Sequence, residues 1–200
     1  MMIKQVLAVC GLGGMLLLSA CAPTDLVIKP GYRAVGESRG NGGAVLLVSP
    51  QEGTQTGAER VQYVYGEIKD SNGRVKGNIT GSVSSAALVR DALQQELYKA
   101  GYSVQVGQAL SKEAAQGVVL SNVKVTLDEL TTLVKSEAEC SVALSLEIWK
   151  QGALVRKLTY GKTVSDFALK DRELLHQQLL QKALSAVMKD AAADIVTYLK

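Results

Sequence analysis

The 200-residue sequence has few of the residues that build catalytic and metal sites. It contains one histidine, three cysteines, one tryptophan and one phenylalanine, and its 22 basic residues nearly balance 19 acidic ones. A lone histidine excludes a zinc site built from several histidines. A formal net charge of +3 gives no electrostatic reason to expect nucleic-acid binding. The composition therefore predicts no binding of a cofactor, metal or nucleic acid.

The sequence also lacks a long apolar run. The longest, Val6–Leu18, is about 13 residues, whereas a membrane-spanning helix needs roughly 20. It follows Lys4 and is followed by the small residues Ser19 and Ala20. This succession of a charged, an apolar and a small-residue region is typical of a secretory signal peptide. The alternative, an uncleaved anchor helix, is disfavoured by three glycines inside the run.

The end of this segment, Leu18-Ser19-Ala20-Cys21, resembles the lipobox of bacterial lipoproteins. The resemblance implies cleavage just before Cys21, with Leu18, Ser19 and Ala20 recognised by the signal peptidase. It also implies a diacylglycerol on the Cys21 thiol and an acyl chain on its new amino group, which together give stable membrane anchoring. Because Ala22 rather than Asp follows the cysteine, it implies the outer membrane of a Gram-negative host, facing the periplasm.

Three segments follow from this reading: a signal peptide (1–20), the lipidated cysteine with a tether or loop (21–43), and a globular domain (44–200). Proline and glycine recur through residues 22–43, and the apolar residues there show no regular spacing. We predict a flexible spacer that lets the domain stand off the membrane. The alternative for its second half is an ordered loop on the domain edge.

Cysteine chemistry is nearly absent from the mature chain. Cys10 leaves with the signal peptide and Cys21 would be blocked by lipid, so no internal disulfide can form. The remaining Cys140 lies on the apolar side of a predicted strand, where a free cysteine behaves as a small buried hydrophobe. We predict a core position for it.

Apolar periodicity predicts one α+β domain with a mostly antiparallel sheet and two helices packed on one face. Asn72-Gly73 is a strong hairpin signal between two short strands. Alternation is cleanest over residues 138–148, which indicates a strand with one face on the core. Arg156 breaks the alternation of the next strand, so a bulge or exposed end is expected there. The predicted elements are a strand at 44–48, a hairpin at 61–79, a helix at 86–100, a strand at 102–106, a meander from 118 to 165 and a helix at 171–199.

No constellation of polar residues predicts catalysis. The single histidine, His176, is expected on the surface or rim of the last helix. Asp128-Glu129, Glu137 and Glu139 are placed on outward strand positions, typical of a solvated face rather than of paired catalytic carboxylates. Trp149 is expected to cover the sheet edge, with anchoring of a partner or membrane as the alternative. We therefore predict a protein that is not an enzyme, with no catalytic, cofactor or metal residues.

The element order behind a lipobox resembles the YajG-like lipoproteins of Gram-negative outer membranes. Residues 88–104, which read LVRDALQQELYKAGYSV, carry this likeness through their helix-Gly-Tyr-x-Val exit. Auxiliary lipoproteins of ABC transport systems show the same exit and are the alternative. The YajG-like resemblance implies no known chemistry. We expect an envelope lipoprotein that contacts an unidentified envelope protein, or else a transport or assembly accessory that binds a hydrophobic or lipidic ligand.

Overall fold

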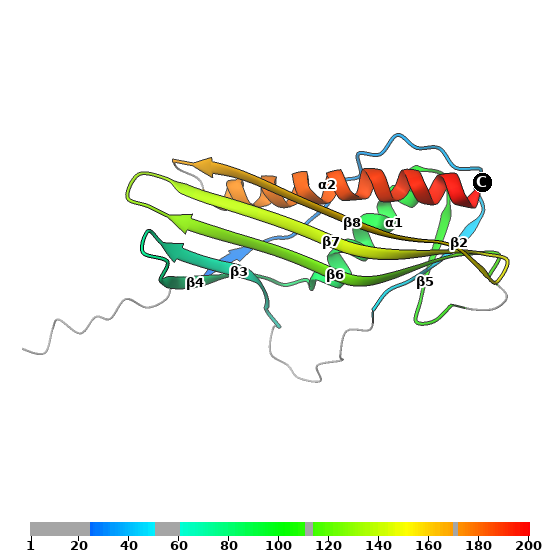
Figure 1. Ribbon diagram of the computed structural model, residues 1–200, viewed down its shortest axis with the longest axis horizontal. Coiled ribbons are helices and arrows are strands. Elements are labelled where there is room, and N and C mark those ends of the chain that lie inside the picture. The colour runs from blue at the N-terminus through cyan, green and yellow to red at the C-terminus, as the bar shows by residue number, and fades with distance from the viewer. Residues whose placement is uncertain (1–24, 51–60, 111–113, 170–171) are drawn as a thin grey trace, which may run out of the picture.

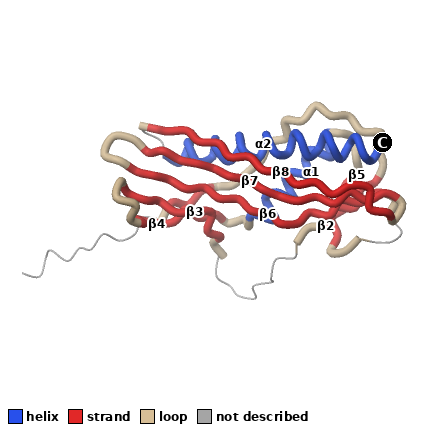
Figure 2. Tube along the Cα trace, in the orientation of Figure 1, coloured by secondary structure: helices blue, strands red, loops and turns tan. Residues whose placement is uncertain are grey.

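The computed structural model describes residues 25–50, 61–110, 114–169 and 172–200. They form a single α+β domain in which two helices cover one face of an eight-stranded sheet (Figures 1 and 2). The fold class predicted from the sequence is confirmed. The elements in chain order are β1 (Leu26–Ile28), β2 (Ala44–Val48), β3 (Tyr63–Asp70), β4 (Val75–Gly81), α1 (Ser85–Lys99), β5 (Ser103–Gly107), β6 (Gln116–Thr131), β7 (Ser136–Lys150), β8 (Ala153–Ala168) and α2 (Arg172–Leu199).

The sheet is mixed rather than mostly antiparallel. β6, β7 and β8 are long antiparallel neighbours. The other side of β6 pairs in parallel with β2 near its start and with β3 near its end. β5 then continues from β2 in parallel, while β4 and β1 continue from β3. Parallel neighbours are joined by long crossover segments, so local sequence patterns do not show which strands pair.

Alternation along β7 produces the predicted two-faced strand. Its inward side chains, from Ala138 to Ile148, are almost completely buried, and Cys140 is among them. Burial raises the pKa of the Cys140 thiol to about 12, so the predicted core position is confirmed. The pairing of β7 with β8 shifts register beside Arg156, which confirms the bulge expected there.

Local signals also set the ends of the first helix and the first hairpin. The Ser84 side chain accepts a hydrogen bond from the Ala87 amide at 3.1 Å and caps α1. Gly101 follows the helix at φ +97°, and Gly73 occupies the β3–β4 turn at φ +76°. Both backbone conformations favour glycine over other residues.

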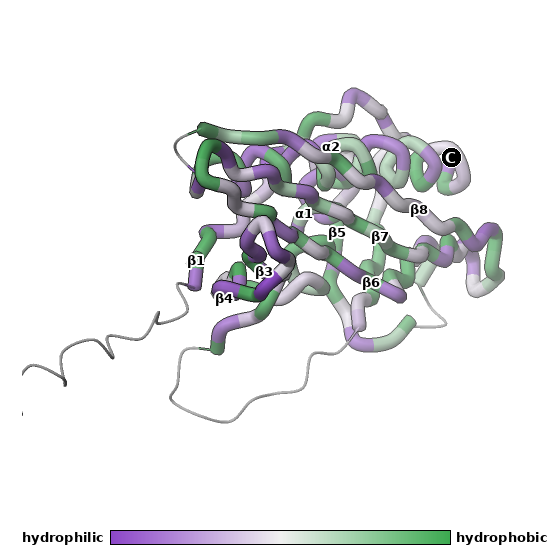
Figure 3. The backbone as a smooth tube through the Cα atoms, turned by 60° about the vertical axis from the view of Figure 1, so that its left-hand side comes forward, coloured by the Kyte–Doolittle hydropathy of each residue, from purple (hydrophilic) through white to green (hydrophobic). Residues whose placement is uncertain are grey.

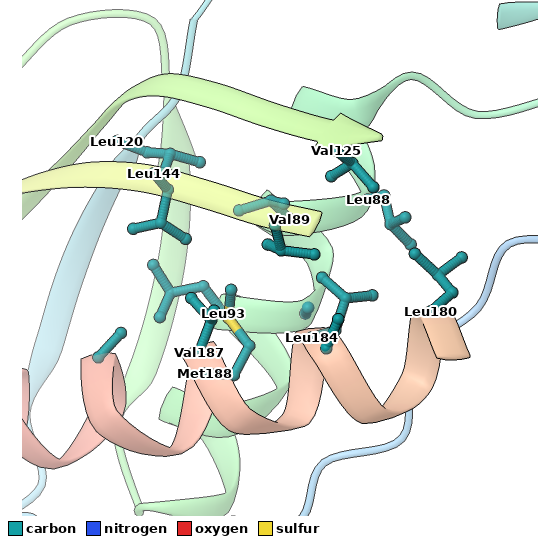
Figure 4. Packing of buried hydrophobic residues seen from close by; sticks show 14 of the residues in the cluster. Leu88, Val89, Leu93, Leu120, Val125, Leu144, Leu180, Leu184, Val187 and Met188 are labelled. Atoms are coloured by element: carbon teal, nitrogen blue, oxygen red, sulfur yellow. The ribbon is translucent and has the colours of Figure 1, made fainter. Parts of the chain in front are cut away.

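The core lies between the sheet and the two helices. Figure 4 shows Leu93 of α1 and Val187 and Met188 of α2 meeting side chains from β6 and β7. Leu93 and Met188 are fully buried, and Leu144 of β7 is 1% exposed. Burying a leucine-sized side chain contributes about 1.5–3 kcal/mol. The layer is therefore both the main source of stability and densely filled.

One end of the domain collects three chain reversals, and we call it the turn end. It comprises the β3–β4 turn (71–74), the β6–β7 turn (132–135), the last residues of β8 and the first turn of α2 (Figure 1). The opposite end holds the β7–β8 turn and the C-terminus of α2. The strand directions place the ends of both β3 and β6 at the turn end, because these strands are parallel neighbours.

Residues 31–43 form a strap that is hydrogen-bonded to both helices. The Glu96 side chain of α1 accepts hydrogen bonds from the Tyr32 hydroxyl and from the amides of Val35 and Gly36 at 2.8 and 2.9 Å. Gln181 of α2 holds the strap through the backbone of residue 33. The short strand β1 precedes the strap. It was not predicted from the sequence, because three residues are too few to show an alternation of apolar and polar side chains.

Removing the Glu96 carboxylate should loosen this strap. Glu96→Ala leaves two amides and one hydroxyl without their acceptor, and we expect a loss of about 1–2 kcal/mol in unfolding free energy. Amide exchange at residues 35 and 36 should accelerate much more than exchange in β7. Gln95→Ala, on the exposed side of the same helix, is the matched control. Equal exchange in both variants would show that the strap is held by other contacts.

Candidate functional site

A buried charged cluster lies beneath the turn end and joins β6 to the start of α2. The Glu129 carboxylate is 3.0 Å from His176 Nε2 and 2.7 Å from Arg172 Nε. The side chains of Glu129 and His176 are fully buried, whereas that of Arg172 is 42% exposed. The Thr131 hydroxyl donates to the same carboxylate at 2.7 Å. The Arg172 guanidinium, the His176 imidazole and a hydroxyl therefore surround one carboxylate.

Both nitrogens of His176 face oxygen acceptors. Nδ1 is 2.6 Å from the Arg172 carbonyl oxygen, and Nε2 faces Glu129. The cluster thus packs the buried imidazole of α2 against the buried carboxylate of β6.

The environment also fixes the charge of Glu129. Burial on its own would raise the pKa of this carboxyl. Hydrogen bonds from His176, Arg172, Thr131 and Ser136 together outweigh burial and lower the pKa to about 2. Glu129 is therefore ionised across the whole range in which proteins normally work.

The geometry makes the cluster a structural joint rather than a reactive centre. A general base needs a free nitrogen within reach of a substrate proton, and His176 has both nitrogens engaged and no exposed surface. The expected surface or rim position of His176 is wrong. The helix repeat explains the error, since His176 lies four residues before the buried Leu180 and shares its side of α2.

The outward placement predicted for Glu129 is wrong as well. Val125, Leu127 and Glu129 follow one another on the inward side of β6, so strand alternation itself carried the signal. The other three carboxylates, Asp128, Glu137 and Glu139, are exposed as predicted.

Those exposed carboxylates line an open groove of about 600 Å³ on the sheet face away from the helices. Asp128 and Glu139 are cross-strand neighbours, and Phe167 of β8 lies opposite Glu137. The Asp128 side chain accepts a hydrogen bond from the Glu67 amide at 3.0 Å, and Glu137 forms an ion pair with Lys135. A second hollow, of about 320 Å³, lies between the two turns and Arg172. Both hollows belong to the turn end.

The other residues singled out in the sequence are placed as follows. The lipobox residues Leu18, Ser19, Ala20 and Cys21, like Ala22, lie outside the described residues. Trp149 is half-buried in β7, between β6 and β8, so it lies near a strand end and not on a sheet edge. Within the described ranges, no group of three or more histidine, cysteine or acidic residues is arranged to hold a metal ion. No helix in the same ranges is long and apolar enough to span a membrane.

Comparison with known proteins identifies the fold. No protein-family model matches the chain, and no curated protein sequence matches it. A crystal structure of a Xanthomonas campestris protein of the DUF330 family is similar over 86% of this chain and 95% of its own length. Its TM-score is 0.56 and its sequence identity is 10%. At this identity the likeness shows a shared fold and nothing about activity.

Two further solved structures carry lipoprotein names. A candidate lipoprotein of Caulobacter crescentus covers 66% of this chain and 89% of its own, with 19% identity and a TM-score of 0.35. A minor lipoprotein of Acinetobacter baumannii covers 68% of this chain and 91% of its own, with 12% identity and a TM-score of 0.32. These scores are too low to support an argument about this chain. Neither structure is named as YajG-like, so that resemblance stays a hypothesis.

Proposed function

We propose that this chain is a lipid-anchored envelope lipoprotein that works through contacts with another envelope protein and not by catalysis. The lipobox ending at Cys21 carries this proposal, because it follows a charged and then an apolar region in the order that export requires. The acyl chains hold the protein in the outer membrane, facing the periplasm, and Ala22 after the cysteine supports that location over the inner membrane.

The state of the titratable groups supports a non-enzymatic role. The single histidine is buried in an ion pair with Glu129, and the single cysteine of the described residues is buried with a raised pKa. A reactive thiol would instead be exposed with a lowered pKa. The groups best suited to catalysis are thus used to hold the fold together.

The alternative role, an accessory that binds a hydrophobic ligand between sheet and helices, requires an apolar cavity in that layer. Leu93, Leu144 and Met188 fill the layer where the helices cross the sheet (Figure 4). This packing argues against a ligand cavity there. The two hollows at the turn end lie on the surface: charged residues make up most of the lining of the larger one, and charged, hydroxyl and apolar residues together line the smaller one.

Mass spectrometry of the purified protein tests the proposal. Lys29 precedes Pro30, where trypsin cuts poorly, so digestion should release a peptide from Cys21 to Arg33. We expect this peptide to start at Cys21 and to carry the mass of a diacylglyceryl group and one acyl chain. Cys21→Ser should abolish both the modification and flotation with membranes. An unmodified Cys21 peptide from membrane-free protein would contradict the proposal.

Membrane fractionation with a one-residue variant tests the location. The protein should sediment with the outer membrane in a density gradient, and Ala22→Asp should move it to the inner membrane without changing its acylation. Recovery of both proteins in the inner membrane would contradict the outer-membrane assignment. Crosslinking in intact envelopes then identifies the protein partner.

A further inference from the structure

Exposed apolar side chains gather at the turn end. Leu133 and Val134 in the β6–β7 turn are 106% and 77% exposed, and Phe167 at the end of β8 is 58% exposed. Figure 3 shows hydrophobic segments at this end of the tube. Exposed apolar clusters of this kind mark surfaces that contact proteins or membranes. The cluster consists of Leu130, Leu133, Val134, Phe167, Leu169 and Leu174.

The direction of β1 shows that the chain enters the domain from the same end. β1 is parallel to β4, which runs away from the β3–β4 turn. The N-terminal end of β1 therefore faces the turn end. The Asp25 side chain accepts a hydrogen bond from the Asn78 amide at 2.8 Å, and Asn78 pairs with Glu67, whose amide contacts Asp128. Asp25 thus lies level with Asp128, two residues before Leu130.

The connection between lipid and domain is short. Cys21 precedes Asp25 by four positions, and four residues span at most about 14 Å. At about 3.4 Å per strand residue, Asp128 is roughly 10 Å from the end of β6. An acylated Cys21 therefore reaches little beyond the level of the turn end. The strap from residue 31 onward packs on the helices, so it supplies no additional spacer.

Charge does not explain the cluster. Among the described residues around it, Lys69 is paired with Glu67, Lys76 with Asp70 and Lys135 with Glu137, while Arg74 of the β3–β4 turn is exposed. An electrostatic membrane site presents an excess of basic side chains to anionic lipid. The described residues of this end therefore present more exposed apolar side chains than unpaired basic ones to a membrane.

We propose that the turn end is a membrane-contact surface, whose apolar side chains enter the interfacial region of the phospholipid leaflet that holds Cys21. This inference rests on the proposed lipidation and adds a second point of attachment. The lipid is connected to the domain through the start of β1, and Leu133 and Val134 contact the membrane from the β6–β7 turn. The lipid and the apolar turn together set the orientation of the domain. They direct the opposite end, which holds the β7–β8 turn and the C-terminus of α2, away from the membrane.

Site-directed spin labelling of the acylated full-length protein in phosphatidylcholine vesicles tests the orientation. Leu133→Cys places one nitroxide at the turn end, and Leu154→Cys places a matched one on a half-exposed leucine at the opposite end. Cys140 is buried and Cys21 acylated, so neither competes for the label. We expect the ratio of oxygen to nickel-chelate collision rates to be at least threefold higher at position 133. Adding phosphatidylglycerol should not change it.

Equal ratios at the two positions, in protein that still floats with vesicles, would overturn the contact surface while leaving the lipoprotein assignment intact. Failure to float together with absence of the acyl mass would overturn both. Spin–spin broadening at position 133 that disappears on dilution with unlabelled protein would assign the surface to a second copy of the chain and overturn the membrane contact. Circular dichroism on both variants verifies that these exposed positions tolerate the label.

Discussion

Replacing Glu129 with alanine is expected to lower the free energy of unfolding by about 3–5 kcal/mol, the range seen when one partner of a buried ion pair is removed. His176 Nε2 and Arg172 Nε would then both lose the carboxylate that they face. The Arg172 side chain is partly exposed and can turn to water, whereas the His176 side chain is fully buried and cannot. Denaturant unfolding followed by circular dichroism at pH 7 measures the change.

The same cluster should make stability depend on acid. The pKa of Glu129 falls from its ordinary value of 4.5 to about 2 in the folded protein. A carboxyl group whose pKa is lower in the folded than in the unfolded protein stabilises the fold at pH values above its unfolded pKa. This stabilisation is lost as the pH falls through its folded pKa. The contribution, about 3 kcal/mol, should therefore be complete above pH 5 and disappear between about pH 4.5 and 2.

Glu129→Gln should remove this part of the acid dependence, since the amide does not titrate. Glu139→Gln is the matched control, because Glu139 is an exposed glutamate on the neighbouring strand. It should change stability by less than about 0.5 kcal/mol. If the two variants behave alike at pH 7 and at pH 3, the cluster is not the joint that we describe.

The parts of the fold that depend on local signals could be predicted from the sequence. The Asn72-Gly73 turn, the serine cap of α1 and the alternation of β7 each act within a few residues. The parallel pairs could not be predicted, since the contact of β3 with β6 joins residues about 60 positions apart in the chain. The inward position of Glu129 was missed for a related reason. A carboxylate is expected in the core only where polar partners face it, and here the partners Arg172 and His176 lie on α2, more than 40 residues later.

The contact between β3 and β6 also requires glycine at one position. A Cβ built on Gly66 would overlap the Leu127 carbonyl, coming within 2.6 Å of its carbon. This is backbone, so a side-chain rotation cannot relieve the clash. The pairing of β3 with β4 shifts register just before Gly66, which brings the two backbones together. The sequence shows Gly66 as one of several hairpin glycines and gives no sign of this role.

Gly66→Ala is therefore expected to destabilise the protein by about 2–3 kcal/mol, as overpacking does in other cores. Gly161→Ala is the control, because its nearest neighbour is the Val142 carbonyl oxygen at 3.9 Å and its backbone is not left-handed. That change should be neutral or stabilising by up to about 1 kcal/mol. Thermal and denaturant unfolding of both variants distinguishes a close backbone approach from a general preference for glycine in strands.

A double-mutant cycle connects this contact to the charged cluster. Ile68, two residues after Gly66, pairs directly with Glu129, so moving β3 away from β6 should shift the carboxylate relative to His176. Combining Gly66→Ala with Glu129→Ala should then cost less than the two separate losses together, by at least about 0.5 kcal/mol. Strict additivity would show that β6 holds Glu129 in place without help from β3. Coupling would show that the parallel pairing, which joins two otherwise separate hairpins, also positions the joint beneath the turn end.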